Sequence, residues 1–178
     1  MKKVPGKSSV REFLIYIPIS FLVEFSGCTN SSANGDLDCV KAIDGNIGPY
    51  GWFVTNLPAW GIFELTDEEK INSLVLMSGK DAGENSYGYL ISFKVILKVG
   101  PNTWINLSAL QVKEDPQAQI TNDGTVMLNS AISNLTLEFT TLTNVQSIRL
   151  DVTNSEDSKN LWIREIIPGF NGTFKNTL

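Results

Sequence analysis

The sequence has 178 residues, of which 42% are hydrophobic and 19% charged, and its formal net charge is −5 with no histidine. A chain of this length and apolar content can bury the core of one domain. The acidic balance, with no basic cluster beyond the first few residues, argues against nucleic acid as a partner, because such binding requires clustered Lys and Arg. With two cysteines and no histidine, the sequence also excludes a zinc site.

The N-terminal segment has two interpretations. Basic residues precede an apolar run over residues 13–23, which has about the length of a signal-peptide core. Pro18 interrupts this run and acidic residues flank it, a pattern that favours edge strands at residues 12–17 and 20–27 instead. We therefore treat residues 1–22 as an N-terminal extension that is either a signal-like segment or an extra edge strand.

The two cysteines, Cys28 and Cys39, flank a polar loop over residues 29–38. A disulfide between them would close a short loop and stabilise it modestly. The alternative is a pair of free thiols, and the sequence alone leaves both open.

A tight turn follows at Asp44-Gly45-Asn46, directly after an apolar Ala-Ile pair. Glycine supplies the positive φ of such a turn, and Asp and Asn close it through side-chain hydrogen bonds. The turn directs backbone carbonyls and a carboxylate toward one spot, which is the oxygen-rich surrounding that a hard cation prefers. The same tripeptide is also typical of an ordinary turn, so a cation site requires ligands from elsewhere in the chain.

From residue 62 onward the hydrophobic pattern has a period of two, which is typical of half-buried strands. No amphipathic helix is predicted, and residues 66–70 form one helical turn at most. Half-buried strands separated by regular turn signals predict an all-β, antiparallel sandwich. The strands predicted after the N-terminal segment are 60–65, 71–77, 89–99, 103–107, 109–113, 125–128, 134–140, 146–153 and 161–169.

Three polar loops interrupt this pattern, at residues 29–38, 78–88 and 153–160. In an antiparallel sandwich, ligand contacts are commonly built on loops that a rigid scaffold positions. The alternative for each loop is a solvated connector.

Several short motifs stand in a distinctive order along the chain, namely 42–46, Trp52, 60–65, 71–76, 91–97, 100–104, 147–150 and 161–166. Their order and spacing resemble the discoidin or coagulation-factor C-type domain, of the galactose-binding-like superfamily, and are similar to carbohydrate-binding modules. The resemblance covers residues 23–170 and leaves residues 171–178 as a C-terminal tail. It implies an eight-stranded jelly-roll β-sandwich with a non-catalytic role, in which loops at one end bind the ligand.

Many carbohydrate-binding members of this family hold a structural Ca²⁺ between the Asp-Gly-Asn turn and a glutamate near the C-terminus. Residue by residue, the resemblance implies ligands from Asp44, Asn46 and Glu165, with the backbone carbonyl of Lys41 as a further one. The two carboxylates would supply charge, and turn carbonyls the remaining oxygens. The alternative is that Asp44 caps its own turn and Glu165 is an ordinary surface carboxylate.

Two tyrosines in glycine-containing loops, Tyr50 and Tyr87, are the best candidates to stack on a sugar ring. We assign Trp52, Trp60 and Trp104 to packing instead. Family members that bind galactose often use a histidine, which this chain lacks, so a galactose site of that design is not expected. The polar residues predicted to flank the tyrosines and to hydrogen-bond sugar hydroxyls are Lys80, Asp81, Asn85, Asn154 and Lys159.

The sequence contains no catalytic triad, nucleophile elbow or P-loop, so we expect no enzyme. The first hypothesis is an extracellular or cell-surface, lectin-like module that binds a glycan or glycoprotein, for example in cell adhesion. The alternative is a structural or adhesion protein that binds a protein partner in a larger assembly, such as a virion or coat. Membrane lipid is disfavoured as a partner, because loops 29–38 and 78–88 are polar and the net charge opposes anionic lipid.

Overall fold

The computed structural model describes residues 23–33, 35, 37–46, 50–82, 85–171 and 173–174. Both interpretations of the extension 1–22, including the strand predicted at 12–17, therefore lie outside the described residues. The same holds for most of the tail at 171–178. Among the described residues, no helix is long and apolar enough to cross a membrane.

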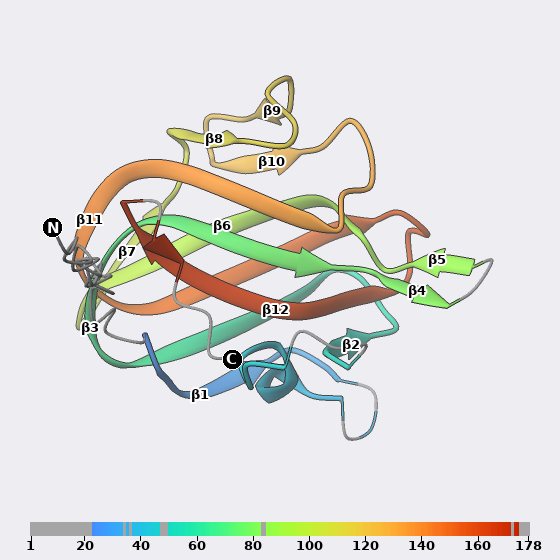
Figure 1. Cartoon of the computed structure of the whole chain (residues 1–178), viewed down its shortest axis with the longest axis horizontal. Coiled ribbons are helices and arrows are strands. Elements are labelled where there is room, and N and C mark those ends of the chain that lie inside the picture. The colour runs from blue at the N-terminus through green and yellow to red at the C-terminus, as the bar shows by residue number, and fades with distance from the viewer. Residues whose placement is uncertain are drawn as a thin grey trace, which may run out of the picture.

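The described chain is almost entirely antiparallel β-structure (Figure 1). It has one 3₁₀ helix, η1 (Cys39–Ala42), in which the Asp38 carboxylate caps the first turn by accepting from the Val40 N–H at 3.1 Å. The strands are β1 (Phe25–Asn30), β2 (Trp52–Val54), β3 (Ala59–Ser78), β4 (Lys80–Ala82), β5 (Asn85–Tyr87), β6 (Leu90–Gly100), β7 (Thr103–Asn106), β8 (Leu110–Val112), β9 (Gln119–Ile120), β10 (Thr125–Met127), β11 (Asn134–Ser155), β12 (Leu161–Phe170) and β13 (Thr173–Phe174).

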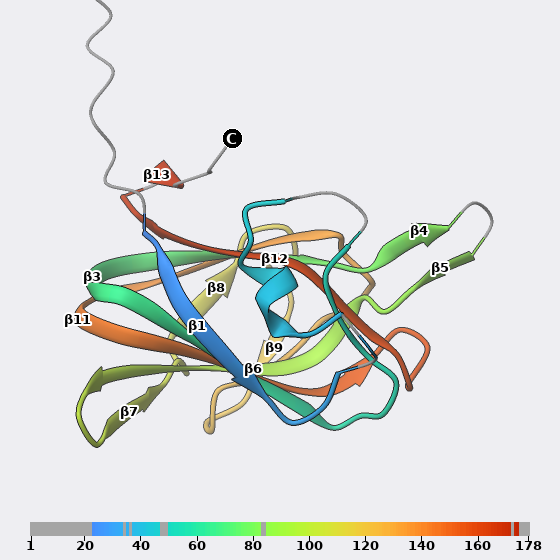
Figure 2. The ribbon, with the colours of Figure 1, turned by 90° about the horizontal axis from the view of Figure 1, so that it is seen from below.

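Two long strands, β3 and β11, contribute to both layers of a sandwich. The first half of β3 pairs with β1 and with the second half of β11, and β6 continues this first layer together with β7 and β10. The second half of β3 pairs with β12 and with the first half of β11, to which β8 is added. Both long strands bend at the end of the molecule where β7 lies (Figures 1 and 2). The predicted all-β jelly-roll sandwich is confirmed.

The bends differ from the sequence prediction. Residues 66–70, predicted to form one helical turn at most, are extended within β3, so the two strands predicted on either side of them are one. β11 likewise unites the strands predicted at 134–140 and 146–153. Most side chains of 66–70 are exposed, because β3 crosses there from one layer to the other outside the core. The Gln146 side-chain amide donates to the Glu68 carboxylate at 2.8 Å, which joins the two bends.

Inward-facing side chains of the two layers form one hydrophobic core. Trp52 is fully buried in it, with its ring edge-on to Phe63 at 6.1 Å and its indole N–H donating to the Ser32 carbonyl at 3.0 Å. Trp52 therefore packs as predicted, whereas Trp104 is 41% exposed and its assignment to packing is wrong. The other large, fully buried side chains are Phe63, Phe93, Ile71, Leu74, Leu76, Leu90, Leu97, Leu135, Leu137, Ile148 and Leu150.

The loop predicted at 78–88 is instead largely a hairpin, built from β4 and β5. Two glycines with positive φ, Gly79 at 78° and Gly88 at 79°, turn the chain out of the sandwich and back. The other two predicted loops are shorter than expected, because β1 extends to Asn30 and β11 extends to Ser155. The residues of β4 and β5 are mostly polar, so these two short strands leave no period-two hydrophobic signal in the sequence.

Candidate functional site

A disulfide joins the start of the candidate metal turn to the sandwich. Cys28 of β1 and Cys39 of η1 form a disulfide, with their Cα atoms 6.0 Å apart. The sequence had left both a disulfide and two free thiols open. Cys39 is 2% exposed, so the bridge lies within the core cluster. It anchors η1 beside β1, and the chain leaves η1 directly into the Asp-Gly-Asn turn.

The two carboxylates predicted to bind a cation lie together. Glu165 of β12 is only 5% exposed, and its carboxylate accepts a hydrogen bond from the Gly45 N–H beside Asp44. Burial first, and then the charge of Asp44, raise the pKa of Glu165 to about 8, although the bond from Gly45 opposes this shift. The Oε2 atom of Glu165 has no hydrogen-bond partner among the described residues. A buried carboxylate oxygen in this state calls for a cation or a proton.

The turn itself is held in two ways. The Asn46 N–H donates to Asp44 Oδ1 at 2.9 Å, so Asp44 does close its own turn. The Lys41 ammonium lies 3.6 Å from Asp44 Oδ2. Lys41, whose backbone carbonyl is a predicted ligand, therefore also brings a positive charge to the site. Within the described ranges, no three Asp, Glu, His or Cys side chains cluster as a metal site. Calcium would therefore need further oxygens from carbonyls or water, which is common for this ion.

The predicted sugar-contacting residues come from segments at the other end from the strand bends. In Figure 1 the β4–β5 hairpin, β2 and the loop between β11 and β12 all lie at that end. Backbone hydrogen bonds tie the hairpin base to β12, from Gly79 N–H to the Trp162 carbonyl at 2.8 Å and from Trp162 N–H to the Gly88 carbonyl at 3.0 Å. The Glu156 N–H donates to the Tyr89 carbonyl at 3.0 Å, which attaches the β11–β12 loop to the same place.

Within the hairpin, Lys80 stands opposite Tyr87 in the β4–β5 register, Asp81 opposite Ser86, and Asn85 opposite Ala82. Four of the predicted ligand-binding residues therefore share one small two-stranded element. The backbone of β4 and β5 projects beyond the sandwich (Figures 1 and 2).

Three further predicted positions approach the same end. Tyr50 is 58% exposed and stands just before β2, which pairs with the first residues of β12. Asn154 is half-buried at the end of β11, where it pairs with Ser92, and Lys159 is exposed in the following loop. The structure thus brings the predicted ligand-binding segments together at one end.

Asp157 determines the shape of the β11–β12 loop. Its carboxylate accepts from the backbone N–H groups of Lys159 and Asn160 at 3.0 and 2.7 Å, and from the Ser155 hydroxyl at 3.0 Å. Burial alone would raise the pKa of Asp157, but the hydrogen bonds from Asn160, Lys159 and Ser155 outweigh it and lower the pKa. The loop that carries Lys159 is therefore an ordered turn around an ionised carboxylate.

Sequence reasoning missed Arg164, which lies beside these segments. Its Nη2 donates to the Ser133 hydroxyl at 2.6 Å and lies 3.4 Å from the Asn134 side-chain oxygen. The sequence signal was an arginine directly before Glu165, inside a segment that was interpreted only as a strand. Arg149, by contrast, is already paired, because its Nε donates to Asp151 at 2.7 Å and its guanidinium stacks over Trp60 at 5.2 Å.

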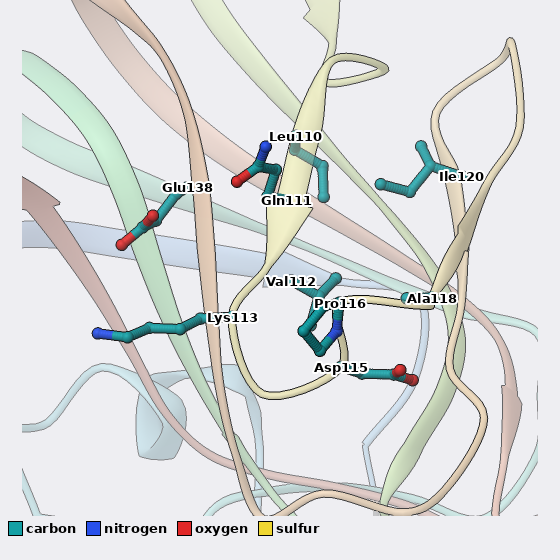
Figure 3. Close-up of a pocket in the computed structure, with 9 residues that line it drawn as sticks. All are labelled: Leu110, Gln111, Val112, Lys113, Asp115, Pro116, Ala118, Ile120 and Glu138. Carbon is teal, nitrogen blue, oxygen red and sulfur yellow. The ribbon is translucent and has the colours of Figure 1, made fainter.

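A cavity of about 390 Å³ lies away from the predicted ligand residues, beside β8 and β9 (Figure 3). Its walls combine apolar side chains with four polar ones, and none of them is aromatic. Hydrogen bonds from the backbone and side chain of Asn129 lower the pKa of Asp115, which lines the cavity. The Asp115 carboxylate therefore already has hydrogen-bond partners within the protein. The cavity is lined by Leu110, Gln111, Val112, Lys113, Asp115, Pro116, Ala118, Ile120 and Glu138.

The sequence matches no protein-family model and no curated protein. Solved structures are similar in fold. A pectin-binding carbohydrate-binding module is 16% identical, with a TM-score of 0.60 over 85% of this chain and 94% of that one. The family 32 module of AlyQ, in complex with 4,5-unsaturated mannuronic acid, is 17% identical, with a TM-score of 0.59 over 85% of this chain and 99% of that one.

The family 32 carbohydrate-binding module of NanJ from C. perfringens, in complex with galactose, is 15% identical, with a TM-score of 0.59 over 79% of this chain and 90% of that one. At these identities the similarity establishes the shared fold alone, because one fold hosts many functions. Function has to be argued from the site.

Proposed function

We propose that this chain is a non-catalytic glycan-binding module, similar to the carbohydrate-binding modules and discoidin domains of the galactose-binding-like superfamily. The observation that carries the proposal is the convergence of exposed Tyr50, the β4–β5 hairpin and the β11–β12 loop at one end of the sandwich. At this end the exposed Tyr50 ring, with the amide of Asn154 and the ammonium of Lys159, would match what a sugar offers, namely an apolar ring face and a rim of hydroxyls. The similar structures support a glycan ligand at this general level, since they include pectin-binding and galactose-bound modules.

A structural Ca²⁺ is part of the proposal. Asp44 and Glu165 are already together, and one buried oxygen of Glu165 has no partner among the described residues. Both carboxylates would bind the ion, with Asn46 and the Lys41 carbonyl as the further ligands that the resemblance implies. The ion would take the place of the proton that the raised pKa of Glu165 favours, and it would join the turn after η1 to β12. It would compete with the Lys41 ammonium for Asp44.

The proposed location is extracellular or at a cell surface. The disulfide between Cys28 and Cys39 supports it, because such bonds persist mainly in oxidising compartments. Exposed polar loops suited to glycans are also typical of proteins that meet their ligands at surfaces.

A glycan array followed by calorimetry tests the proposed site. We expect Tyr50→Ala and Tyr87→Ala each to weaken binding of the best glycan by roughly tenfold, because each loses a stacking surface. Trp104→Ala is the matched control, since Trp104 is also an exposed aromatic but lies on β7 near the strand bends. Unchanged binding in both tyrosine variants would remove this site. If no glycan on the array binds, the favoured function becomes that of a structural or adhesion protein that binds a protein partner.

A further inference from the structure

Arg164 is a partly buried cation whose charge has no carboxylate opposite it in the part of the chain that the structure describes. Three other cations among the described residues do have a carboxylate partner, namely Lys41 with Asp44, Lys94 with Asp123 and Arg149 with Asp151. Removing a guanidinium from water without an anion costs free energy. Such a group is retained most readily where a ligand supplies the missing charge.

A β-bulge places the Arg164 side chain. Ile163 pairs with Ser78 and Glu165 pairs with Met77, so Arg164 is the extra residue of β12 between two consecutive residues of β3. Bulges re-aim side chains in this way and are frequent next to functional sites. The bulge also explains why a period-two interpretation of β12 gave Arg164 no role.

The segment that carries Tyr50 lies directly on Arg164. A Cβ on Gly51 would lie 2.8 Å from the Arg164 Cα and 2.3 Å from the Ile163 carbonyl oxygen, so the two backbones touch. Only glycine permits this approach. The exposed Tyr50 ring therefore begins one residue away from the point of contact with Arg164.

The guanidinium is held in place but is not saturated. Of its five N–H donors, those on Nη2 face Ser133 Oγ at 2.6 Å and Asn134 Oδ1 at 3.4 Å. Nε is buried and has no partner among the described residues. Ser133 is itself fixed, because its carbonyl accepts from the Ser78 N–H at 2.8 Å. The planar group is thus oriented in advance, and because Nε is buried, an incoming anion would meet the Nη donors.

We infer that Arg164 binds the carboxylate of an acidic sugar, either a hexuronate or a sialic acid, and so gives the proposed glycan site its specificity. This inference rests on the proposed function. The planar fork of arginine matches a carboxylate, and charge-assisted hydrogen bonds of this kind are about twice as strong as neutral ones. Ser133 and Asn134 lie beside the guanidinium to bind neighbouring hydroxyls, and Tyr50 offers a stacking face. A neutral sugar would leave the guanidinium unpaired.

Calorimetry with matched ligands tests the inference on the unsubstituted full chain. Trigalacturonate is compared with its carboxyl-reduced counterpart, and 3′-sialyllactose is compared with lactose. We expect at least one acidic ligand to bind about tenfold or more tightly than its neutral partner, since one charge-assisted contact is lost in the neutral sugar. The two pairs distinguish a hexuronate from a sialic acid. This comparison depends on no variant folding correctly.

Variants then assign the effect to the residue. Arg164→Gln should abolish the preference for the acidic ligand over its neutral partner, and Arg164→Lys should restore only part of that preference because the planar fork is lost. Arg149→Gln is the matched control on the other layer. Equal affinities within both ligand pairs, or a preference that survives Arg164→Gln, would overturn the inference and leave the glycan-binding proposal standing. Absence of binding to all four ligands and to a glycan array would overturn both.

Discussion

At the scale of single residues, the contact between Glu165 and Asp44 makes calcium binding testable. Because the pKa of Glu165 is raised to about 8, this carboxyl is mostly protonated at pH 7.5 without a cation, so Gln resembles its neutral form while removing one predicted ligand. In EDTA at pH 7.5 we therefore expect the Glu165→Gln variant to melt no lower than the unsubstituted protein. Millimolar Ca²⁺ should raise the melting temperature of the unsubstituted protein only, because binding to the folded state alone stabilises it.

Glu138→Gln is the matched control, since Glu138 is an exposed carboxylate of β11. Its variant should keep the full response to Ca²⁺ in differential scanning fluorimetry. A response that persists in Glu165→Gln, or that is absent from the unsubstituted protein, would contradict a site between the turn and β12.

Asp157 leads to a prediction about acid. Its pKa is lowered by the folded loop, so ionisation of Asp157 favours folding of that loop. This contribution is fully present above the ordinary value of 3.8 and is lost as the pH falls through the lower value of the folded state. We expect the amides of Lys159 and Asn160 to lose protection and shift in NMR spectra below about pH 4.

Asp157→Asn should weaken the loop near neutral pH, where Asp157 is ionised, and should remove the acid dependence of its two amides. If the two amides instead change around pH 7, or keep their protection down to acid unfolding, Asp157 does not hold the loop.

At the scale of elements, the base of the β4–β5 hairpin depends on Gly79. Its φ is +78°, and a Cβ there would lie 2.2 Å from the Tyr89 ring. Gly79→Ala should therefore destabilise the fold by about 1 kcal/mol or more and weaken glycan binding, because the hairpin leaves its position against β12. Gly27→Ala is the control, since a Cβ on Gly27 meets nothing within 4 Å. Equal melting temperatures and affinities in the two variants would contradict this role.

The elements also show what the sequence can predict. β6, β7, β8, β10 and β12 fall within one or two residues of the predicted strands. Burial alternates along β6, β8 and β10, β12 is an apolar run buried almost throughout, and the exposed β7 follows the turn signal after Gly100. The polar crossing within β3 and the polar segment 80–87 carry no alternating hydrophobic pattern, so the sequence predicts a turn and a loop there. Only the family resemblance predicted that Asp44 and Glu165 lie close together. Arg164 was missed because a β-bulge sets the direction of its side chain, and a bulge leaves no periodic pattern in the sequence.

At the scale of the whole molecule, we expect the two layers to unfold together. One half of β3 lies in each layer, and the same is true of β11. Leu150 lies fully buried in the second half of β11, within the core that both layers share. Leu150→Ala should cost about 2 to 5 kcal/mol through lost burial and a residual cavity. It should lower the midpoint of one common transition, with far-UV circular dichroism and tryptophan fluorescence coinciding.

Met127→Ala on β10 is the control for this experiment, because Met127 is 37% exposed and its truncation leaves the core intact. The two probes report on different features of the fold: circular dichroism follows the strands of both layers, whereas tryptophan fluorescence follows side-chain packing, including that around buried Trp52 and Trp162. If the probes separate in Leu150→Ala, with one layer melting first, the long strands do not couple the layers. The loops at the ligand end would then owe their arrangement to one layer alone, and changes in the core of the other layer would leave glycan affinity untouched.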